Sequence, residues 1–129
     1  MREDKKACTF GVDSPYVDLA AEVFALLADP TRIRIILALR RGEMSVNALA
    51  EAVGKAPATV SQHLAKLRWA KIVRPRQDGT RVFYSLVDEH ARRLVTDAVF
   101  QAQHVVDEPH AHHVDQSAPA VAPGDGTAP

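Results

Sequence analysis

The sequence of 129 residues predicts one mainly α-helical domain that carries a single small β-hairpin. Apolar residues recur at helical spacing over residues 16–71, in four segments separated by caps and turn residues. Over residues 72–86 the spacing of apolar residues changes to two, which indicates paired strands. A last helical pattern begins near Asp88. These observations place the folded domain at residues 16–107.

The N-terminal region is predicted to contain a flexible arm and two helices. Residues 1–15 mix charges with a glycine and a proline and show no sustained period. The first helix is predicted over residues 16–28, where the apolar spacing should pack it on the core or on a partner chain. Asp29 as N-cap and Pro30 at the first helical position then begin a second helix, which is expected to stop at Gly42.

Two further helices are separated by a short turn. Residues 45–53 are predicted to form a short helix with Ser45 as N-cap and Gly54 as terminator. A three-residue turn follows, and the next helix extends over residues 55–71. Two helices joined in this way are typical of a helix-turn-helix unit.

The helix over residues 55–71 has two different faces. Val60, Leu64 and Leu67 recur at spacings of four and three and form one apolar stripe. The other face carries hydroxyls, an amide and a cation near the N-terminal end, the end that enters the major groove in helix-turn-helix proteins. A solvated polar face is the alternative interpretation. The predicted DNA-contacting residues are Thr59, Ser61, Gln62 and Lys66, with His63 as a packing or phosphate-contacting residue.

The net charge of zero conceals an uneven distribution. Residues 31–93 hold thirteen Lys/Arg against five Asp/Glu, a net charge of +8. Residues 1–30 have a net charge of −3, and residues 94–129, which contain no Lys or Arg, have −5. The basic segment contains the predicted recognition helix, as expected of a nucleic-acid-binding face.

Two strands are predicted on either side of the turn dipeptide Asp78-Gly79. Pro75 places the first strand at the edge of the sheet. Arg76 and Arg81 lie near the tip of this hairpin and are also predicted to contact DNA, because a plain edge hairpin would leave both arginines unexplained. A basic hairpin directly after a recognition helix predicts a winged helix-turn-helix fold, in the order of four helices, two strands and a last helix.

The sequence shows no sign of a membrane or secretory segment. No apolar run approaches the ~18 residues that span a bilayer. The N-terminus lacks the apolar core of a secretory signal, so a cytoplasmic location without a membrane partner is expected. Cys8 is the only cysteine, which excludes an internal disulfide and suits a reducing compartment.

Three segments resemble the ArsR/SmtB family of dimeric winged-helix repressors. They are LLADPTRIRIILAL, MSVNALAEAVGKAPATVSQHLAKLR and DGTRVFYSL, and the resemblance covers roughly residues 16–106. Members typically bind operator DNA without metal and release it when metal binds. The resemblance therefore implies a homodimeric, metal-responsive repressor of double-stranded operator DNA and not an enzyme. The arsenic, cadmium and lead sensors of the family carry a Cys-rich motif at the position of residues 44–47, which are Met-Ser-Val-Asn in this chain. Without thiolates there, these thiophilic ions are not the expected effectors.

Five of the six histidines lie in the C-terminal part of the chain, from residue 90 onward. Imidazole together with carboxylate suits zinc, nickel or cobalt. His90 and His104 are fourteen residues apart, so they share one helix face but are separated by roughly 21 Å along the axis. If two copies pair antiparallel across a twofold axis, His90 can face the partner's His104, and the dimer would hold two such sites.

The segment Asp88-Glu89-His90, the following LVTDAVFQAQH and the trailing histidine pair resemble the KmtR-type nickel/cobalt sensors of the family. Gln103 stands where that branch has a Glu, and Asp88 or His110 is the candidate to take its place. The resemblance implies Ni²⁺ or Co²⁺ as effector. The predicted metal ligands are Asp88, His90, His104, His110, His112 and His113.

Other metal-linked interpretations stay open at this point. The zinc-sensing branch also has an Asp and a His at the helix start, but its third ligand position falls on Gln101, so Zn²⁺ is the alternative effector. Residues 108–129 are predicted to be a His-containing, largely disordered tail whose metal affinity could be incidental. A metal-storage or chaperone role would explain this tail alone. A metallohydrolase would require a catalytic motif that the sequence lacks.

Overall fold

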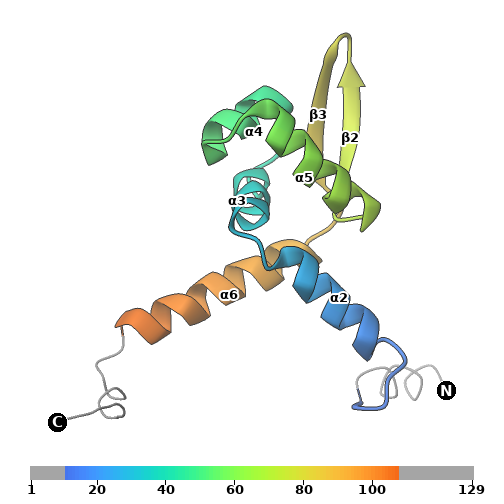
Figure 1. Ribbon diagram of the computed structural model, residues 1–129, viewed down its shortest axis with the longest axis vertical. Helices are drawn as coiled ribbons and strands as arrows, with labels where there is room; N and C mark the ends of the chain where they lie inside the picture. The colour runs from blue at the N-terminus through green and yellow to red at the C-terminus, as the bar shows by residue number, and fades with distance from the viewer. Residues whose placement is uncertain (1–10, 108–129) are drawn as a thin grey trace. The chain divides into compact units, whose positions relative to one another are not determined.

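The computed structural model describes residues 11–107. Its elements in chain order are α2 (Val17–Leu27), α3 (Pro30–Leu39), β1 (Met44–Ser45), α4 (Val46–Val53), α5 (Pro57–Trp69), β2 (Val73–Asp78), β3 (Arg81–Leu86) and α6 (His90–Asp107) (Figure 1). The chain divides after Val95 into two compact parts, so α6 begins in the first part and ends in the second. The predicted fold class, mainly α with a small hairpin, is confirmed.

The first two helices begin where the sequence predicts. Within the first part of the chain α2 buries only Leu27, which leaves most of its other apolar residues exposed. The Asp29 carboxylate accepts a hydrogen bond of 3.0 Å from the Arg32 backbone N–H and so caps α3, with Pro30 at its first position. The predicted stop at Gly42 is wrong. The helix ends at Leu39, and Gly42, at a φ of 142°, completes a turn by donating to the Leu39 carbonyl.

The sheet has three antiparallel strands in the order β1-β3-β2, so Pro75 lies on an edge strand as predicted. The short strand β1, which pairs Met44 with Tyr84, was not predicted from the sequence. The hairpin turn is also shifted by one residue. Asp78 pairs with Arg81, so the two residues between the strands are Gly79 and Thr80, with Gly79 at a φ of 65°.

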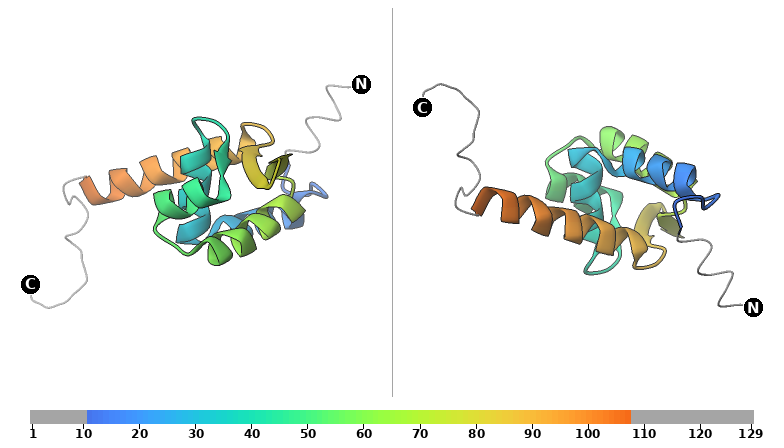
Figure 2. Two further views of the ribbon diagram at one scale, coloured as in Figure 1. Left: turned by 90° about the horizontal axis from the view of Figure 1, so that it is seen from above. Right: turned by 90° about the horizontal axis from the view of Figure 1, so that it is seen from below.

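The helices α3, α4 and α5 pack on one another and on the inner face of the sheet (Figures 1 and 2). Burial of a large aliphatic side chain contributes about 1.5–3 kcal/mol, so the residues in this core dominate the stability of the first part of the chain. The largest fully buried side chains are Ile35, Ile36, Leu49, Val60, Leu64, Leu67 and Val73.

The junction between α5 and β2 is a Schellman motif. The Ile72 N–H donates to the Leu67 carbonyl at 2.9 Å, and the Lys71 N–H donates to the Arg68 carbonyl at 2.8 Å. Lys71 has a φ of 64°, the left-handed conformation that glycine usually occupies at this position. The motif directs the chain out of α5 and into the hairpin.

Candidate nucleic-acid interface and metal ligands

The helix-turn-helix is built by caps that the sequence encodes. Ser45 Oγ accepts a hydrogen bond of 3.1 Å from the Ala48 N–H at the start of α4. Gly54 ends α4 in the left-handed conformation at a φ of 71°, and its N–H donates to the Ala50 carbonyl at 2.9 Å. Three residues, 54–56, separate Val53 from Pro57, which begins α5. The predicted helix, turn and helix are confirmed.

The two faces of α5 are also as predicted. Val60, Leu64 and Leu67 are fully buried. Among the residues assigned to DNA contact, Ser61, Gln62 and Lys66 are exposed and Thr59 is half-buried. Because the apolar stripe is fixed in the core, the polar face of the first turns is rigidly presented to solvent. Such a face can hydrogen-bond base edges and phosphates.

His63 has a partner within the protein. Its Nδ1 accepts a hydrogen bond of 3.0 Å from Arg32 Nε, and Arg32 also donates from Nη1 to the Leu26 carbonyl at 3.1 Å. Arg32 therefore connects α5 to the end of α2 and the start of α3. This contact gives the packing interpretation of His63 a specific partner that sequence spacing did not reveal.

The hairpin carries a basic cluster around one phenyl ring. The Arg76 and Arg81 guanidinium carbons lie 5.1 and 5.0 Å from the centre of the Phe83 ring. Arg76 also forms a bidentate ion pair with Glu43, with both N–O distances at 2.8 Å. The hydrogen bonds from Arg76 lower the pKa of Glu43, and Glu43 in turn raises the pKa of Arg76.

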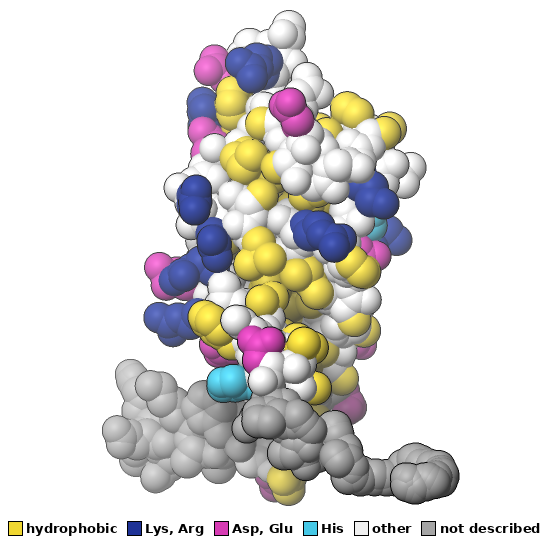
Figure 3. All heavy atoms as spheres, turned by 90° about the vertical axis from the view of Figure 1, so that its left-hand side faces the viewer, with side chains coloured by type: hydrophobic (Ala, Val, Ile, Leu, Met, Phe, Trp, Pro, Cys, Tyr) yellow, Lys and Arg dark blue, Asp and Glu magenta, His cyan; other side chains and the backbone are white. Residues whose placement is uncertain are grey.

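The basic charge is not confined to α5, which contributes only Lys66 and Arg68 to its last turns. In the space-filling view, several Lys and Arg side chains follow the left edge of the visible face and others lie in its middle and right parts, beside a band of hydrophobic side chains (Figure 3). The basic block over residues 31–93 is thus a property of several elements. Within the described residues, no helix is long and apolar enough to cross a membrane.

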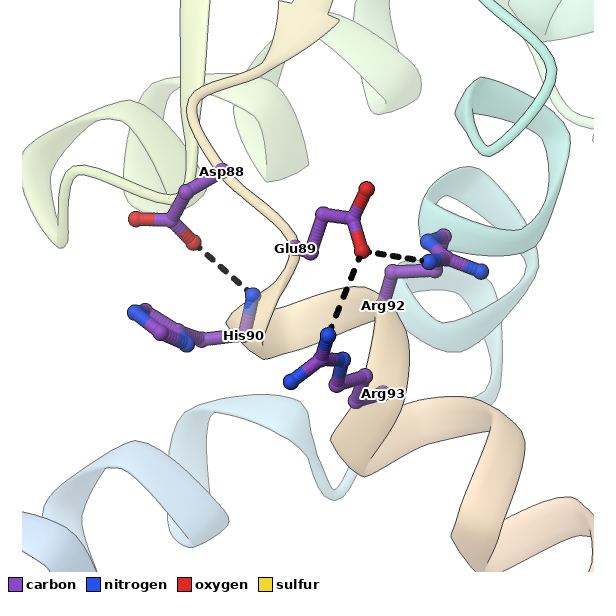
Figure 4. A network of polar contacts seen from close by, with 5 residues as sticks. All are labelled: Asp88, Glu89, His90, Arg92 and Arg93. Atoms are coloured by element: carbon purple, nitrogen blue, oxygen red, sulfur yellow. Dashed lines mark hydrogen bonds and ion pairs between the residues drawn. The ribbon is translucent and has the colours of Figure 1, made fainter.

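The start of α6 holds the candidate metal ligands Asp88 and His90. Asp88 Oδ1 accepts a hydrogen bond of 2.9 Å from the His90 backbone N–H, and the two side chains lie on the same side of the helix start (Figure 4). Glu89 instead forms ion pairs of 2.7 Å with Arg92 and 3.7 Å with Arg93. The hydrogen bond from Arg92 lowers the pKa of Glu89. The Glu89 carboxylate is therefore paired with arginines, whereas the Asp88 carboxylate retains lone pairs that could bind a metal ion next to the His90 imidazole.

The other candidate ligands are distributed along the rest of the chain. His104 is exposed on α6. Residues 11–107 of one chain contain no group of three or more His, Cys, Asp or Glu side chains that could hold a metal ion. The predicted ligands His110, His112 and His113 and the lone Cys8 lie outside the described residues.

A helix-turn-helix followed by a basic hairpin defines the winged helix-turn-helix class. Residues 29–74 match the family model of the arsR family of bacterial regulatory proteins. Over 88 residues the chain is 59% identical to the HTH-type transcriptional regulator KmtR of Mycobacterium tuberculosis, a match that covers 68% of each protein. It is 40% identical over 86 residues to the HTH-type transcriptional repressor SmtB of the same species, covering 67% of this chain and 64% of that repressor. The chain belongs to the arsR family.

Solved structures agree with this assignment. A homodimeric winged helix-turn-helix DNA-binding domain from Mycobacterium bovis, described as a possible ArsR-family regulator, superposes with a TM-score of 0.65 at 30% identity. The match covers 81% of this chain and 100% of that domain. The chain is thus a transcriptional regulator of the ArsR/SmtB type and not an enzyme, as the sequence predicted.

Proposed function

We propose that this protein is a homodimeric repressor that binds double-stranded operator DNA and releases it when Ni²⁺ or Co²⁺ binds. The observation that carries the DNA-binding part is the rigid polar face of α5 beside a basic hairpin. Gln62 is exposed on this face and is assigned to read a base edge, while Arg81 at the hairpin is assigned to a phosphate. A protein with this target acts where the DNA is, in the cytoplasm.

Dimerisation is supported by apolar side chains that the described chain leaves exposed at α2 and α6. A stable interface usually buries at least about 1,000 Å² and contains large apolar residues at its centre. Both helices carry large apolar side chains that are exposed in the single chain. Phe100, for example, is 63% exposed. The exposed apolar residues are Tyr16, Val17, Leu19, Val23 and Phe24 at α2 and Leu94, Val99, Phe100, Val105 and Val106 on α6. Sedimentation equilibrium should show a dimer that Phe100→Glu converts to monomers.

The DNA assignment is tested by comparing two substitutions. Gln62→Ala should relax sequence preference by roughly 1–3 kcal/mol at one base pair per half-site. Arg81→Ala should weaken binding to all sequences and reduce the salt slope by about 0.9 for each phosphate that the protein no longer binds. Fluorescence anisotropy with operator and random duplexes over a range of salt concentrations separates the two effects. An equal loss of affinity on both duplexes for Gln62→Ala would exclude a role in base reading.

The metal site is proposed to form between two copies of the chain. Asp88 and His90 supply an oxygen and a nitrogen ligand at the start of α6, and His104 lies fourteen residues along the same continuous helix. That spacing corresponds to roughly 21 Å, too far for one ion to join both histidines of one chain. The partner's His104 would therefore complete the site, with His110, His112 and His113 as further candidates. Bound metal changes DNA affinity only if it favours one dimer conformation, typically by about 1–3 kcal/mol.

A mixed dimer tests this arrangement. Pairing a His90→Ala chain with a His104→Ala chain places both wild-type residues in one of the two sites and neither in the other. Isothermal titration calorimetry should then give half the wild-type stoichiometry, whereas each mutant homodimer should lose high-affinity binding. If the mixed dimer binds no better than the homodimers, the ligands are not shared between chains.

Zinc is the second candidate effector, because the carboxylate of Asp88 lies beside His90 and both suit a four-coordinate site. Parallel titrations with nickel, cobalt and zinc, read out as operator release, compare the two candidates directly. Deleting residues 109–129 should weaken nickel and cobalt far more than zinc if the tail histidines complete a six-coordinate site. An unchanged nickel and cobalt response after deletion would favour zinc.

A further inference from the structure

The outward face of the hairpin places two arginines on one ring. Arg76 and Phe83 are directly opposite each other in the β2–β3 ladder, and Arg81 lies two residues before Phe83 on β3. Side chains at these positions share one face of a sheet. The opposite face carries Tyr84 and Leu86, which pack against the hydrophobic core. Phe83 thus supports both cations on the side of the hairpin that faces away from the core.

The two arginines differ in their acidic partners. Arg76 Nε and Nη2 donate to the two carboxylate oxygens of Glu43, each at 2.8 Å. Asp78 stands opposite Arg81 in the ladder, but no ion pair joins them among the contacts within residues 11–107. One guanidinium on the ring is therefore held by a carboxylate, and the other is not.

We propose that Glu43 withholds Arg76 from DNA, so that of the two arginines on the Phe83 ring only Arg81 is presented to phosphate. The inference rests on the proposed DNA-binding function of the hairpin. Its physical basis is the bidentate geometry. Glu43 occupies Nε and Nη2, the pair of donors with which a guanidinium binds a phosphate side-on, so this bidentate contact is closed to Arg76 while the ion pair is formed. A phosphate that approached the remaining Nη1 edge would bind a guanidinium whose charge Glu43 already offsets.

Occupation of Arg76 affects the strength and the salt dependence of DNA binding. A phosphate contact strengthens binding to every sequence and carries no sequence information of its own. By occupying Arg76, Glu43 limits the affinity for all sequences, while the base contacts of α5 are unchanged. Glu43 thus sets how tightly the wing holds the DNA backbone, and the ratio of operator affinity to random affinity stays with α5.

The test is Glu43→Gln in the full-length dimer, measured by fluorescence anisotropy with a random duplex over a range of salt concentrations. Removal of the carboxylate charge weakens the hold on Arg76. Each wing that then binds one additional phosphate should steepen the salt slope by about 0.9 and tighten binding about fivefold at 0.15 M salt. An unchanged slope, or weaker binding, would overturn the proposal.

Two controls separate the release of Arg76 from a general charge effect. Glu43→Gln made in an Arg76→Gln background should give no steeper slope, because no arginine is then released. Glu51→Gln removes the same charge from an exposed position on α4 and should likewise leave the slope unchanged. A steeper slope in either control would show that charge alone is responsible.

The experiment also distinguishes this inference from the function on which it rests. If Arg81→Ala reduces the slope and Glu43→Gln leaves it unchanged, the wing binds DNA and only the role of Glu43 is wrong. If Arg81→Ala has no effect, the proposed contact between wing and DNA itself fails. Circular dichroism melts should be near wild type for all variants, because an exposed ion pair contributes little to stability.

Discussion

The hydrogen bond between Arg32 and His63 allows the role of His63 to be tested directly. His63→Ala removes the acceptor of a half-buried, charged Arg32 Nε–H, whose distance to Nδ1 is 3.0 Å. Hydrogen bonds to charged groups contribute about 1.5–3 kcal/mol, and partial access of water to this pair favours the lower end of that range. We therefore expect His63→Ala to reduce the free energy of unfolding by about 1–2 kcal/mol.

The conservative variant separates the hydrogen bond from the volume of the side chain. His63→Asn places an amide oxygen near the position of Nδ1 and should recover part of the lost stability. Urea denaturation followed by circular dichroism gives the free energies, because the single tryptophan, Trp69, is 88% exposed and its environment changes little on unfolding. If the free energies of unfolding of both variants lie within about 0.5 kcal/mol of the wild-type value, the structural role of His63 is refuted.

The same variants test the interpretation that His63 contacts a phosphate. A contact that neutralises a phosphate requires the imidazolium, which cannot accept the hydrogen bond from Arg32 at Nδ1. If His63 acts in this way, His63→Asn should reduce the salt slope of DNA binding by about 0.9 for each phosphate contact that is lost. If His63 acts only by holding α5 against Arg32, the slope should stay at its wild-type value while the affinity changes. A reduced slope with unchanged stability would reverse the assignment made from the structure.

Three further predictions concern stability and are checked by urea denaturation. Leu64→Ala should cost about 2–5 kcal/mol because Leu64 is fully buried, whereas the exposed Lys66→Ala should stay within about 0.5 kcal/mol of wild type. Asp29→Ala should cost about 1 kcal/mol at neutral pH. The hydrogen bond from the Arg32 N–H lowers the pKa of Asp29. The stabilisation by Asp29 is therefore fully present above the ordinary carboxyl pKa and is lost as pH falls through the lowered pKa. A cost of Asp29→Ala that did not change with pH would contradict this role of the carboxylate. Lys71→Gly should stabilise by up to about 1 kcal/mol because Lys71 has a positive φ, and destabilisation would argue against strain there.

The features predicted correctly from the sequence are those set by neighbouring residues. The caps Asp29, Ser45 and Gly54 act within one helical turn, and each is found where the residue type predicts it. The buried stripe of α5 follows from spacings of three and four within one helix. Such signals are local, so a single sequence contains them in full.

Apart from the end of α3, the errors concern the pairing of strands and contacts between distant segments. The strand β1 is two residues long and exists only because Met44 and Ser45 pair with β3. The hairpin turn is shifted by one residue because the ladder continues as far as the pair Asp78–Arg81. Likewise, Glu43 is separated from Arg76 by 33 positions and Arg32 from His63 by 31. No periodicity along the chain encodes these contacts. The only local hint was the acidic residue Glu43 within an otherwise basic segment, which indicated pairing with a cation.

Contacts of basic side chains within the protein, both long-range and local, limit how many phosphates the chain can neutralise. The net charge of +8 over residues 31–93 suggests many phosphate contacts, but a cation neutralises phosphate only if its donors are available. Arg76 is paired with Glu43, Arg32 is held by His63 and a backbone carbonyl, and Glu89 forms ion pairs at the start of α6. The salt dependence of DNA binding should therefore reflect the available cations, such as Lys66 and Arg81, and be smaller than the charge count suggests.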